Sequence, residues 1–363
     1  MSSDPIVAID AELRTKPLPR ELRLGSMRLT ERTYLAVTVR SESGLFGIAT
    51  AQTRGAPVDR IIDELLTPML LGLDSAEVGV CWDRMFRTTI GVGRVGLVMR
   101  AISLIDIALW DLQAKRSGLP LFKLLGGAQR TTIPTMFVAG YAIDDSEVAE
   151  VVNAGETAAY GGHELIKVAR SPHPLTTARL IHALAERIPD STQIVVDGSW
   201  RWSRVDEVLS ELRSWPLERI AWLEDPIAPE LTEAYVALHN RSPVSIGAGD
   251  EVTDYAVLQR LVEAGGLDVV RLDVATLGGV SASIRAIHRL EASGLPISMH
   301  ITPEVSVHLA AAYPAISTVE SFDRLGNRFD PIHELFDPDV QVANGSITMT
   351  DSPGLGVEFS GKA

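Results

Sequence analysis

The chain of 363 residues is 46% apolar and 22% charged, and it carries a formal net charge of −14. This composition excludes a disordered or fibrous chain, and the acidic balance argues against nucleic acid or an anionic membrane as a partner. The single cysteine, Cys81, excludes an internal disulfide and thiolate metal clusters.

Two further features lead us to expect a soluble, cytoplasmic protein. The first residues, Met1 to Pro5, show neither the basic nor the apolar region of a signal peptide. The most apolar long stretch, residues 91–112, is interrupted by charged side chains such as Arg94 and Asp106, so we expect no membrane span there.

The first third of the chain reads as strands followed by helices. Residues 35–49 contain two β-rich runs around a turn. Apolar residues then recur at intervals of three and four up to Leu112, and the helical pattern ends at Gly118. This order predicts an α+β domain over residues 1–127.

From residue 128 onward, short β-rich runs alternate with helical segments. Eight runs read as strands, at residues 133–137, 165–168, 193–196, 220–223, 244–246, 267–272, 296–299 and 315–319. Such alternation predicts a parallel sheet, and eight strands favour closure into an α/β barrel over residues 128–335. No Gly-x-Gly-x-x-Gly motif follows the early strands, which weakens a dinucleotide-binding alternative.

An ionisable residue lies at or near the end of most of these runs. The seven residues, spaced 20 to 30 positions apart, are Lys167, Asp197, Glu224, Asp250, Asp273, His300 and Glu320. Taken singly, a strand-terminal Asp is commonly a helix N-cap, a lone His is commonly a core residue, and a Lys can extend to the surface. The regular spacing of the whole set favours one shared site at the carboxyl ends of the strands, where barrel enzymes place their chemistry.

Three of these residues are acids on consecutive strands, namely Asp197, Glu224 and Asp250. Crowded carboxylates repel one another unless a cation neutralises them, and oxygen ligands without cysteine favour Mg²⁺, with Mn²⁺ as an alternative. Lys167 and His300 flank the three acids and are candidates for proton transfer, with Asp273 placed to orient the imidazole.

In this order and at this spacing, the motifs resemble the mandelate racemase subgroup of the enolase superfamily over nearly the whole chain. The resembling segments are residues 101–111, residues 118–127, Ile166-Lys-Val168, Asp197, Glu224-Asp-Pro226, Gly249-Asp250, Asp273 with Gly278-Gly279, His300 and Glu320. The resemblance implies a (β/α)₇β barrel closed by a capping domain, which is residues 1–127 completed by a tail of about residues 336–363. It also implies a homo-oligomer, either a dimer or an octamer.

The resemblance also implies roles for the site residues. Asp197, Glu224 and Asp250 would hold the metal, Lys167 and the His300–Asp273 dyad would transfer protons, and Glu320 would contact the substrate carboxylate. Ser199, which stands where the family usually has Asn, is expected to contact the substrate.

Other positions depart from the family pattern. Leu165 replaces the first lysine of the Lys-x-Lys motif, and Asp250 stands where this subgroup usually has Glu. Glu251, directly after Asp250, leaves open a shift of the third metal ligand by one residue.

The expected chemistry is Mg²⁺-dependent removal of the proton α to a carboxylate through an enediolate. Dehydration of an acid sugar is the expected outcome, because such dehydratases are numerous in the resembled subgroup. Racemisation or epimerisation of a 2-hydroxy acid uses nearly the same residues and is the alternative. A non-catalytic binding module and an aldolase with a Schiff base at Lys167 are alternatives of other classes.

Substrate choice is expected to depend on capping-domain residues 22–27 and 51–56. Arg23 and Arg54 would there either meet a distal carboxylate of the substrate or, as is common for arginine, lie at a solvated surface.

Overall fold

The N-terminal part of the chain contains an antiparallel sheet. The computed structural model describes residues 3–24, 27–322 and 330–361. The sheet pairs its strands in chain order, namely β1 (Ile6–Leu24), β2 (Met27–Ser41) and β3 (Phe46–Gln52). The two β-rich runs expected within residues 35–49 therefore fall on β2 and β3.

Helices follow this sheet in the chain, and the longest of them, α4, is largely buried and packs against β2 and β3. In chain order they are α1 (Val58–Arg60), η1 (Ile61–Leu66), α2 (Thr67–Leu70), α3 (Val78–Thr88), η2 (Thr89–Val92), α4 (Leu97–Arg116) and α5 (Leu121–Leu124). Strand β3 approaches α4 so closely that a Cβ at Gly47 would lie 1.9 Å from the carbonyl oxygen of Ala108. Asp111 of α4 also accepts a hydrogen bond of 2.8 Å from the amide of Ile48. The sheet and α4 are thus fixed to each other by backbone contact.

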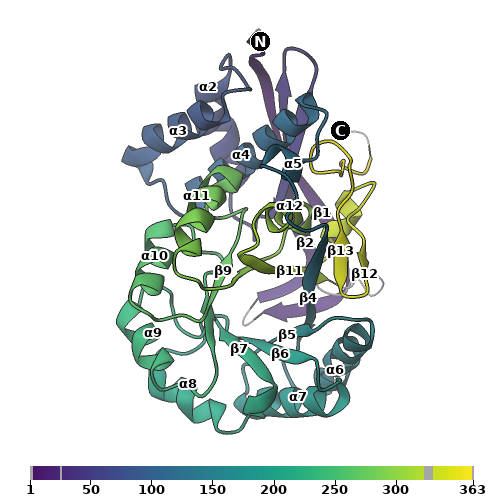
Figure 1. Ribbon diagram of the computed structural model, residues 1–363, viewed down its shortest axis with the longest axis vertical. Coiled ribbons are helices and arrows are strands. Elements are labelled where there is room, and N and C mark those ends of the chain that lie inside the picture. The colour runs from purple at the N-terminus through teal and green to yellow at the C-terminus, as the bar shows by residue number, and fades with distance from the viewer. Residues whose placement is uncertain (1–2, 25–26, 323–329, 362–363) are drawn as a thin grey trace.

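Eight parallel strands then close into a barrel (Figure 1). They are β4 (Thr132–Tyr141), β5 (Leu165–Ala169), β6 (Gln193–Asp197), β7 (Ile220–Glu224), β8 (Ile246–Ala248), β9 (Val269–Leu272), β10 (Ile297–Met299) and β11 (Ile316–Phe322). Closure occurs where β11 pairs with β4, with Val319 opposite Thr135. The closed parallel sheet confirms the predicted barrel.

One α-helix follows each barrel strand except the last in the described part of the chain. These helices are α6 (Asp145–Tyr160), α7 (Pro174–Arg187), α8 (Val205–Leu212), α9 (Thr232–His239), α10 (Tyr255–Glu263), α11 (Gly279–Glu291) and α12 (Pro303–Ala312). They lie around the outside of the strands in Figure 1. The result is the (β/α)₇β order expected from the resemblance.

Strand β8 lies two residues later than the run expected at residues 244–246. Gly247 and Gly249 hide its true position, because glycine is depleted in strands and weakens the β signal. At Gly249, where φ is +133°, a Cβ would lie 2.1 Å from the carbonyl oxygen of Arg271. A glycine is therefore needed for the chain to pass β9 and reach Asp250.

The C-terminal segment contacts both parts of the molecule. It contains η4 (Ile332–Leu335), β12 (Val342–Ala343) and β13 (Ser346–Thr348). Strand β13 pairs with the start of β4, while the amide of Leu121 donates to Gly354 O and the amide of Leu355 donates to Asp111. The boundary after residue 127, with the tail completing the capping domain, remains a prediction.

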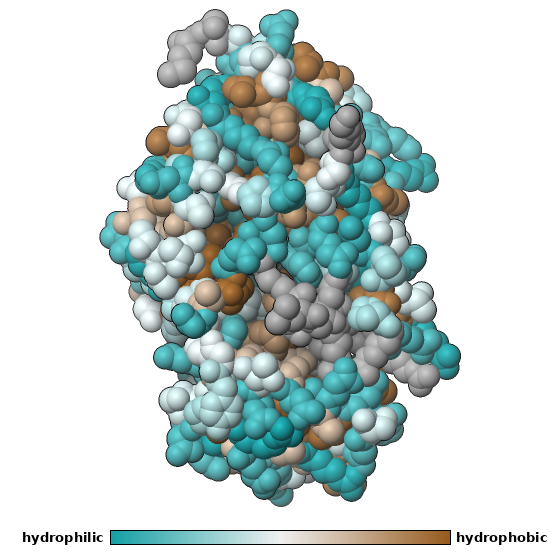
Figure 2. All heavy atoms as spheres, turned by 90° about the vertical axis from the view of Figure 1, so that its right-hand side faces the viewer, coloured by the Kyte–Doolittle hydropathy of each residue, from teal (hydrophilic) through white to brown (hydrophobic). Residues whose placement is uncertain are grey.

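Hydrophilic side chains predominate on the face that carries this segment (Figure 2). Within the described ranges, the structure contains no helix that combines the length and the apolar character needed to cross a bilayer.

Candidate active site

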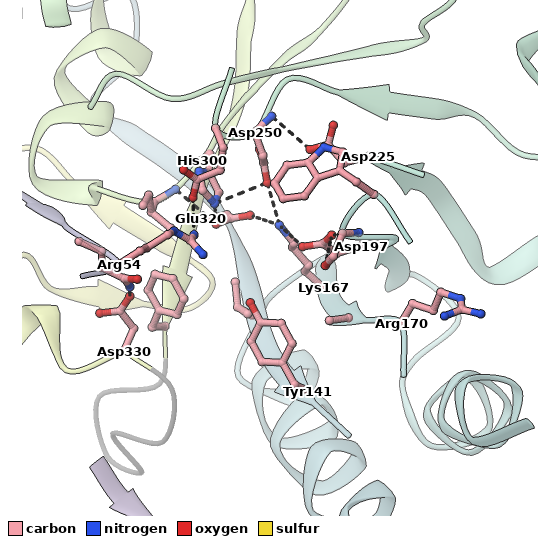
Figure 3. A pocket seen from close by; sticks show the side chains of 18 of the residues that line it. Arg54, Tyr141, Lys167, Arg170, Asp197, Asp225, Asp250, His300, Glu320 and Asp330 are labelled. Atoms are coloured by element: carbon pink, nitrogen blue, oxygen red, sulfur yellow. Dashed lines mark hydrogen bonds and ion pairs between the residues drawn. The ribbon is translucent and has the colours of Figure 1, made fainter. Parts of the chain in front are cut away.

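The carboxyl ends of the barrel strands bring together the ionisable residues identified from the sequence. Figure 3 labels Lys167, Asp197, Asp250, His300 and Glu320. Their places are Lys167 in β5, Asp197 at the end of β6, Glu224 at the end of β7, Asp250 just after β8, Asp273 directly after β9, His300 directly after β10 and Glu320 within β11. All are buried except Asp197, which is partly buried. The structure thus unites all seven residues at one mouth of the barrel.

Asp197, Glu224 and Asp250 form a compact carboxylate cluster. Each offers an oxygen atom, and these three oxygens lie within 4.8 Å of one another. Burial, together with the charges of Asp250 and Asp197, raises the pKa of Glu224 to about 8, although Arg271 and Lys167 oppose the shift. The raised pKa means that full ionisation of this cluster is unfavourable in the absence of a cation. A hard divalent cation bound to the oxygens would stabilise the ionised form.

The ammonium group of Lys167 lies among the same carboxylates. Its Nζ donates to Asp250 Oδ2 at 3.2 Å and to Glu320 Oε1 at 2.7 Å, and it forms ion pairs with Asp197 Oδ2 at 3.2 Å and with Glu224. Burial acts to lower the pKa of Lys167, but the four carboxylates outweigh burial and hold it well above the ordinary value. In this state Lys167 is a charged counter-ion, whereas a Schiff-base nucleophile needs a neutral amine.

Arg271 of β9 is a site residue that sequence reasoning missed. Its side chain is fully buried, and its Nε lies 2.9 Å from Glu224 Oε2 and 3.0 Å from Asp250 Oδ1, while Nη2 pairs with Glu320. Residues two apart in a strand face the same side of the sheet, so Arg271 points the same way as Asp273. The sequence did contain a signal for Arg271, because it is a charged residue inside an apolar strand and lies two positions before Asp273.

The imidazole of His300 is held by a carboxylate. Nδ1 lies 2.9 Å from Asp273 Oδ2, so Nδ1–H donates to Asp273 and directs Nε2 toward Asp250 Oδ2 at 3.5 Å and Glu320 Oε2 at 3.9 Å. Asp273 is itself fixed, because the amide of Ala275 donates to its Oδ1 at 2.7 Å. Burial acts to lower the pKa of His300, but the three carboxylates raise it to about 10. The arrangement suits proton transfer at Nε2.

Ser199 and Asp225 support the carboxylate cluster through hydrogen bonds. The amide and hydroxyl of Ser199 donate to Asp197 Oδ1 at 2.8 and 3.0 Å. Asp225 accepts from the amides of Gly249 at 3.1 Å and Asp250 at 3.2 Å. Ser199 also lines the cavity described below, and its expected contact with the substrate stays a prediction.

Left-handed backbone at residues other than glycine is concentrated just after the site strands. It occurs at Ser199, Trp200, Asp225, Glu251, Ile301 and Thr302. Each such residue costs on the order of 1–3 kcal/mol and persists where the surrounding structure holds it in place, often at functional sites. The loops that carry the site are therefore held in shape by their surroundings.

Glu251 joins the barrel to the N-terminal part of the chain. Its carboxylate pairs with Arg54 and Arg100, which together outweigh burial and lower the pKa of Glu251 to about 2. Asp250, by contrast, lies in the carboxylate cluster, so the geometry supports Asp250 and not Glu251 as the third acid. Arg54 is therefore engaged in an ion pair at the cavity wall, whereas the side chain of Arg23 lies outside the described part of the structure.

A cavity of about 580 Å³ lies over the cluster, within the usual size range of small-molecule sites. Gln52 at the end of β3 and Arg54 in the turn after it line the cavity, and both belong to the expected specificity segment 51–56. The side chains of the other expected segment, residues 22–27, lie outside the described part of the structure.

Asp330, which follows β11, also lines the cavity and accepts hydrogen bonds from Tyr34 and Gln52. Sequence reasoning missed it, because it lies in a segment without a periodic pattern.

The chain matches two family descriptions along most of its length. Residues 7–126 match the mandelate racemase / muconate lactonizing enzyme N-terminal domain, and residues 149–363 match the enolase C-terminal domain-like family. The chain belongs to the mandelate racemase/muconate lactonizing enzyme family. The fold and family expected from the sequence are thereby confirmed.

Relatives with known activities or structures cover nearly the whole chain. The L-talarate/galactarate dehydratase of Salmonella typhimurium is 28% identical over 340 residues, which is 92% of this chain and 82% of that protein. The L-talarate dehydratase of Polaromonas sp. JS666, crystallised with Mg and L-glucarate, superposes with a TM-score of 0.88 at 25% identity, over 99% of this chain and 96% of that one. A racemase from Streptomyces coelicolor with bound magnesium superposes with a TM-score of 0.87 at 26% identity, over 98% and 97% of the two chains.

Proposed function

We propose that this enzyme removes the proton α to the carboxylate of an acid sugar, in a Mg²⁺-dependent reaction that ends in dehydration. One observation carries the proposal: two protonatable groups and a carboxylate cluster meet on the floor of one cavity. Lys167 Nζ and His300 Nε2 lie 3.2 and 3.5 Å from the same oxygen, Asp250 Oδ2. The acid-sugar dehydratases among the relatives support the substrate class.

The donor set fits Mg²⁺ held by Asp197, Glu224 and Asp250. Glu224 Oε1 is buried and accepts no hydrogen bond within the described ranges, where its contact is the ion pair with Lys167. Mn²⁺ suits the same oxygens. When bound, the cation stabilises the negative charge that develops on the substrate carboxylate, and it offsets the carboxylate charge that otherwise keeps Lys167 and His300 protonated.

His300 is the proposed base. The Nδ1–H bond to Asp273 fixes the tautomer, so Nε2 takes the α-proton as the C–H bond breaks and an enediolate forms. The protonated Nε2 then donates the same proton to the β-hydroxyl, which leaves as water when the C–O bond breaks. The resulting enol becomes a 2-keto-3-deoxy acid.

Lys167 and Glu320 act together on another side of the cavity. Glu320 Oε1 accepts a hydrogen bond from Lys167 Nζ and pairs with Arg271, and this fixes where the ammonium points. Contact between Glu320 and the substrate carboxylate needs a shared proton, because two bare carboxylates repel each other. We therefore propose Lys167 as the second proton-transfer group and Glu320 as the residue that positions it.

Racemisation or epimerisation of a 2-hydroxy acid is the second candidate. It is favoured by the placement of Lys167 on β5 and His300 after β10, because groups reaching a carbon from two strands can address both of its faces. The racemase from Streptomyces coelicolor supports it. A non-catalytic module is disfavoured, because the carboxylate cluster, Lys167 and the His300–Asp273 pair lie close together.

The proposed partner is a small-molecule carboxylate, with neither nucleic acid nor membrane expected. A homo-oligomer, either a dimer or an octamer, in the cytoplasm remains part of the proposal. The net charge of −14 and the single, buried Cys81 are compatible with these expectations.

A panel of acid sugars incubated with the Mg²⁺-loaded enzyme tests the proposal. We expect one or a few acids to lose the mass of one water, as measured by mass spectrometry, and His300→Asn to form no such product. Conversion of an acid to its epimer without loss of water would establish the racemase alternative. Absence of both reactions across the panel, with Mg²⁺ bound, would overturn the proposal.

A further inference from the structure

A second cavity of about 390 Å³ lies between the N-terminal part and the barrel, and it shares no lining residue with the cavity over the carboxylate cluster. Helix α3 and the segment before α4 form one side of it, and α10 and α11 form the other. Its volume falls in the lower part of the range typical of small-molecule sites. None of the proposed catalytic residues lines it, so the proposed function leaves this cavity unexplained.

Aromatic and apolar side chains line much of this cavity. The rings of Trp82 and Phe86 stack with centroids 4.7 Å apart, and Trp82 is fixed further because its Nε1 donates to Gly278 O at 2.8 Å. Met99 and Leu277 are buried beside them. Val95 of the same cavity is exposed, so a flat apolar body can pack there beside the rings without losing hydrogen bonds to water.

Three arginines line the same cavity, each stacked on an aromatic ring. The guanidinium carbon lies 4.1 Å from the Phe86 centroid for Arg94, 4.0 Å from the Trp82 centroid for Arg285 and 5.3 Å from the Tyr255 centroid for Arg289. Stacking occupies the faces of the guanidinium groups. Their N–H groups lie in the guanidinium plane and can still donate hydrogen bonds.

These arginines lack close acidic partners in the part of the chain that the structure describes. No ion pair within 4.0 Å joins Arg94, Arg285 or Arg289 to any described carboxylate, although Arg285 feels the more distant charge of Asp106. Asp254 also lines the cavity, but its carboxylate caps α10 by accepting a hydrogen bond of 3.0 Å from Ala256 N. Concentrated positive charge is unusual in a chain whose net charge is −14.

We propose that this cavity binds a small organic anion, with a flat apolar body and a carboxylate or phosphate group. The body packs against the apolar side chains of Val95, Met99 and Leu277 beside the two rings, and the anionic group accepts hydrogen bonds from Arg94, Arg285 and Arg289. Arginine suits this role, because its planar donors match the oxygens of carboxylate and phosphate. The proposal is independent of the reaction in the barrel.

Calorimetric titration with 1-naphthoate, phenyl phosphate and inorganic phosphate tests the proposal. We expect saturable binding of 1-naphthoate or phenyl phosphate to the wild type, and much weaker binding of inorganic phosphate, which has no apolar body. Arg285→Gln should weaken the binding about tenfold or more, the effect of losing one charge-assisted hydrogen bond. Arg289→Gln provides a second variant, and both side chains are exposed enough that we expect folding to be preserved.

Arg84→Gln is the matched control, because Arg84 is an exposed arginine on α3 that does not line the cavity. It removes the same charge from the same region and should leave the binding unchanged. Binding that Arg84→Gln weakens as much as Arg285→Gln, or that is as strong for inorganic phosphate, would reduce the cavity to a diffuse positive surface and overturn the proposal. Failure of both organic probes to bind would also overturn it. If neither probe binds and Arg285→Gln instead separates two copies of the chain, the proposal is likewise overturned.

Discussion

At the scale of single residues, the site is a buried set of charges that are only partly balanced. Five carboxyl groups face three cationic side chains, namely Asp197, Glu224, Asp250, Asp273 and Glu320 against Lys167, Arg271 and His300. Charges in a buried site interact strongly, because the surroundings screen them less than water does. The surplus of negative charge explains why a divalent cation would bind there, and it predicts how single substitutions act.

Lys167→Met should raise the affinity for Mg²⁺ while abolishing proton transfer by this residue. The ammonium lies among the three acids that would hold the metal, so it competes with the cation for their charge. Because unit charges about 4 Å apart interact by about 4 kcal/mol at an effective dielectric constant near 20, a gain of tenfold or more is expected. Calorimetric titration of the metal-free proteins with MgCl₂ measures it. Lys123→Met, which removes an exposed lysine far from the acids, should leave the affinity unchanged, and equal or weaker affinity in Lys167→Met would contradict the competition.

His300→Asn should abolish turnover while the protein remains folded. The loss of a positioned acid–base group typically costs about 10²–10⁴-fold in rate, and here the group acts twice. Asp273→Asn should be milder, because it weakens the orientation of the imidazole without removing it. Steady-state rates on the identified substrate, together with melting temperatures, measure both effects. Wild-type turnover by His300→Asn would rule out the dyad as the proton-transfer group.

Sequence analysis identified the residues that end barrel strands because position in a βα unit determines where a side chain lies. It missed Arg271, because attention to strand ends ignores a residue inside the strand, even though the two-residue period places it on the face of Asp273. It also missed Asp330, whose place on the cavity wall depends on contacts with Tyr34 and Gln52, nearly three hundred positions away. Such long-range contacts leave no local pattern.

At the scale of elements, the order of strands and helices followed from periodicity, whereas the boundaries depended on tertiary contacts. The shift of β8 toward Asp250 shows this, because its glycine Gly247 is explained by the close approach of Trp222 in β7, and Gly249 just after it by the close approach of Arg271 in β9. Helix α4 and strand β3 are a second case, since Gly47 is required by the carbonyl of Ala108. Two predictions concern contacts of this kind.

Gly47→Ala should destabilise the protein strongly. Its Cβ would lie 1.9 Å from Ala108 O and 2.5 Å from Leu112 N, both backbone atoms that cannot move without shifting α4. Overpacking typically costs about 1–3 kcal/mol, and a clash with backbone lies at or beyond the upper end. Gly79→Ala in α3 is the matched control, because nothing lies within 4 Å of its Cβ, and alanine should stabilise the helix by about 0.5–1 kcal/mol. Urea unfolding compares the two, and equal stability of both variants would contradict the packing argument.

His308 of α12 should make the protein less stable at acidic pH. Its Nδ1 accepts from Phe122 N at 3.3 Å in α5, and its Nε2 donates to Leu355 O at 3.1 Å in the C-terminal segment. Burial lowers the pKa of His308 to about 4, against the opposing effect of the Leu355 hydrogen bond. Between the ordinary pKa of about 6.5 and this value, the unfolded chain binds more protons than the folded one, so the free energy of unfolding falls as the pH falls.

His308 lowers the free energy of unfolding by about 2 kcal/mol at pH 5 and by about 3 kcal/mol at pH 4, at about 1.4 kcal/mol for each pH unit. Urea unfolding at about pH 7.5 and about pH 5 measures it, and the difference between the two values should shrink by that amount in His308→Gln. His173→Gln, at an exposed histidine, should retain the wild-type difference. An unchanged difference in His308→Gln would show that other groups cause the acid sensitivity.

At the scale of the whole molecule, the cavity is formed where two parts of the chain meet. Arg54 and Arg100 reach Glu251 on the barrel, and Asp330 after the last strand accepts hydrogen bonds from the N-terminal sheet. Side chains of the N-terminal sheet and side chains of the barrel thereby line the same cavity. In the proposed function, the barrel carries the chemistry, while Arg32 and Gln52 of the N-terminal sheet help to shape the space for the substrate.

The central claim is that His300 and the carboxylate cluster together remove the proton α to a carboxylate. The most direct measurement is mass spectrometry of acid sugars incubated with the enzyme and Mg²⁺ in deuterated water. We predict that the substrate loses water and that its product carries deuterium, that exhaustive chelation stops the reaction and added Mg²⁺ restores it, and that Glu224→Gln does not react. Full reaction after chelation, or exchange that is undiminished in His300→Asn, would contradict the account.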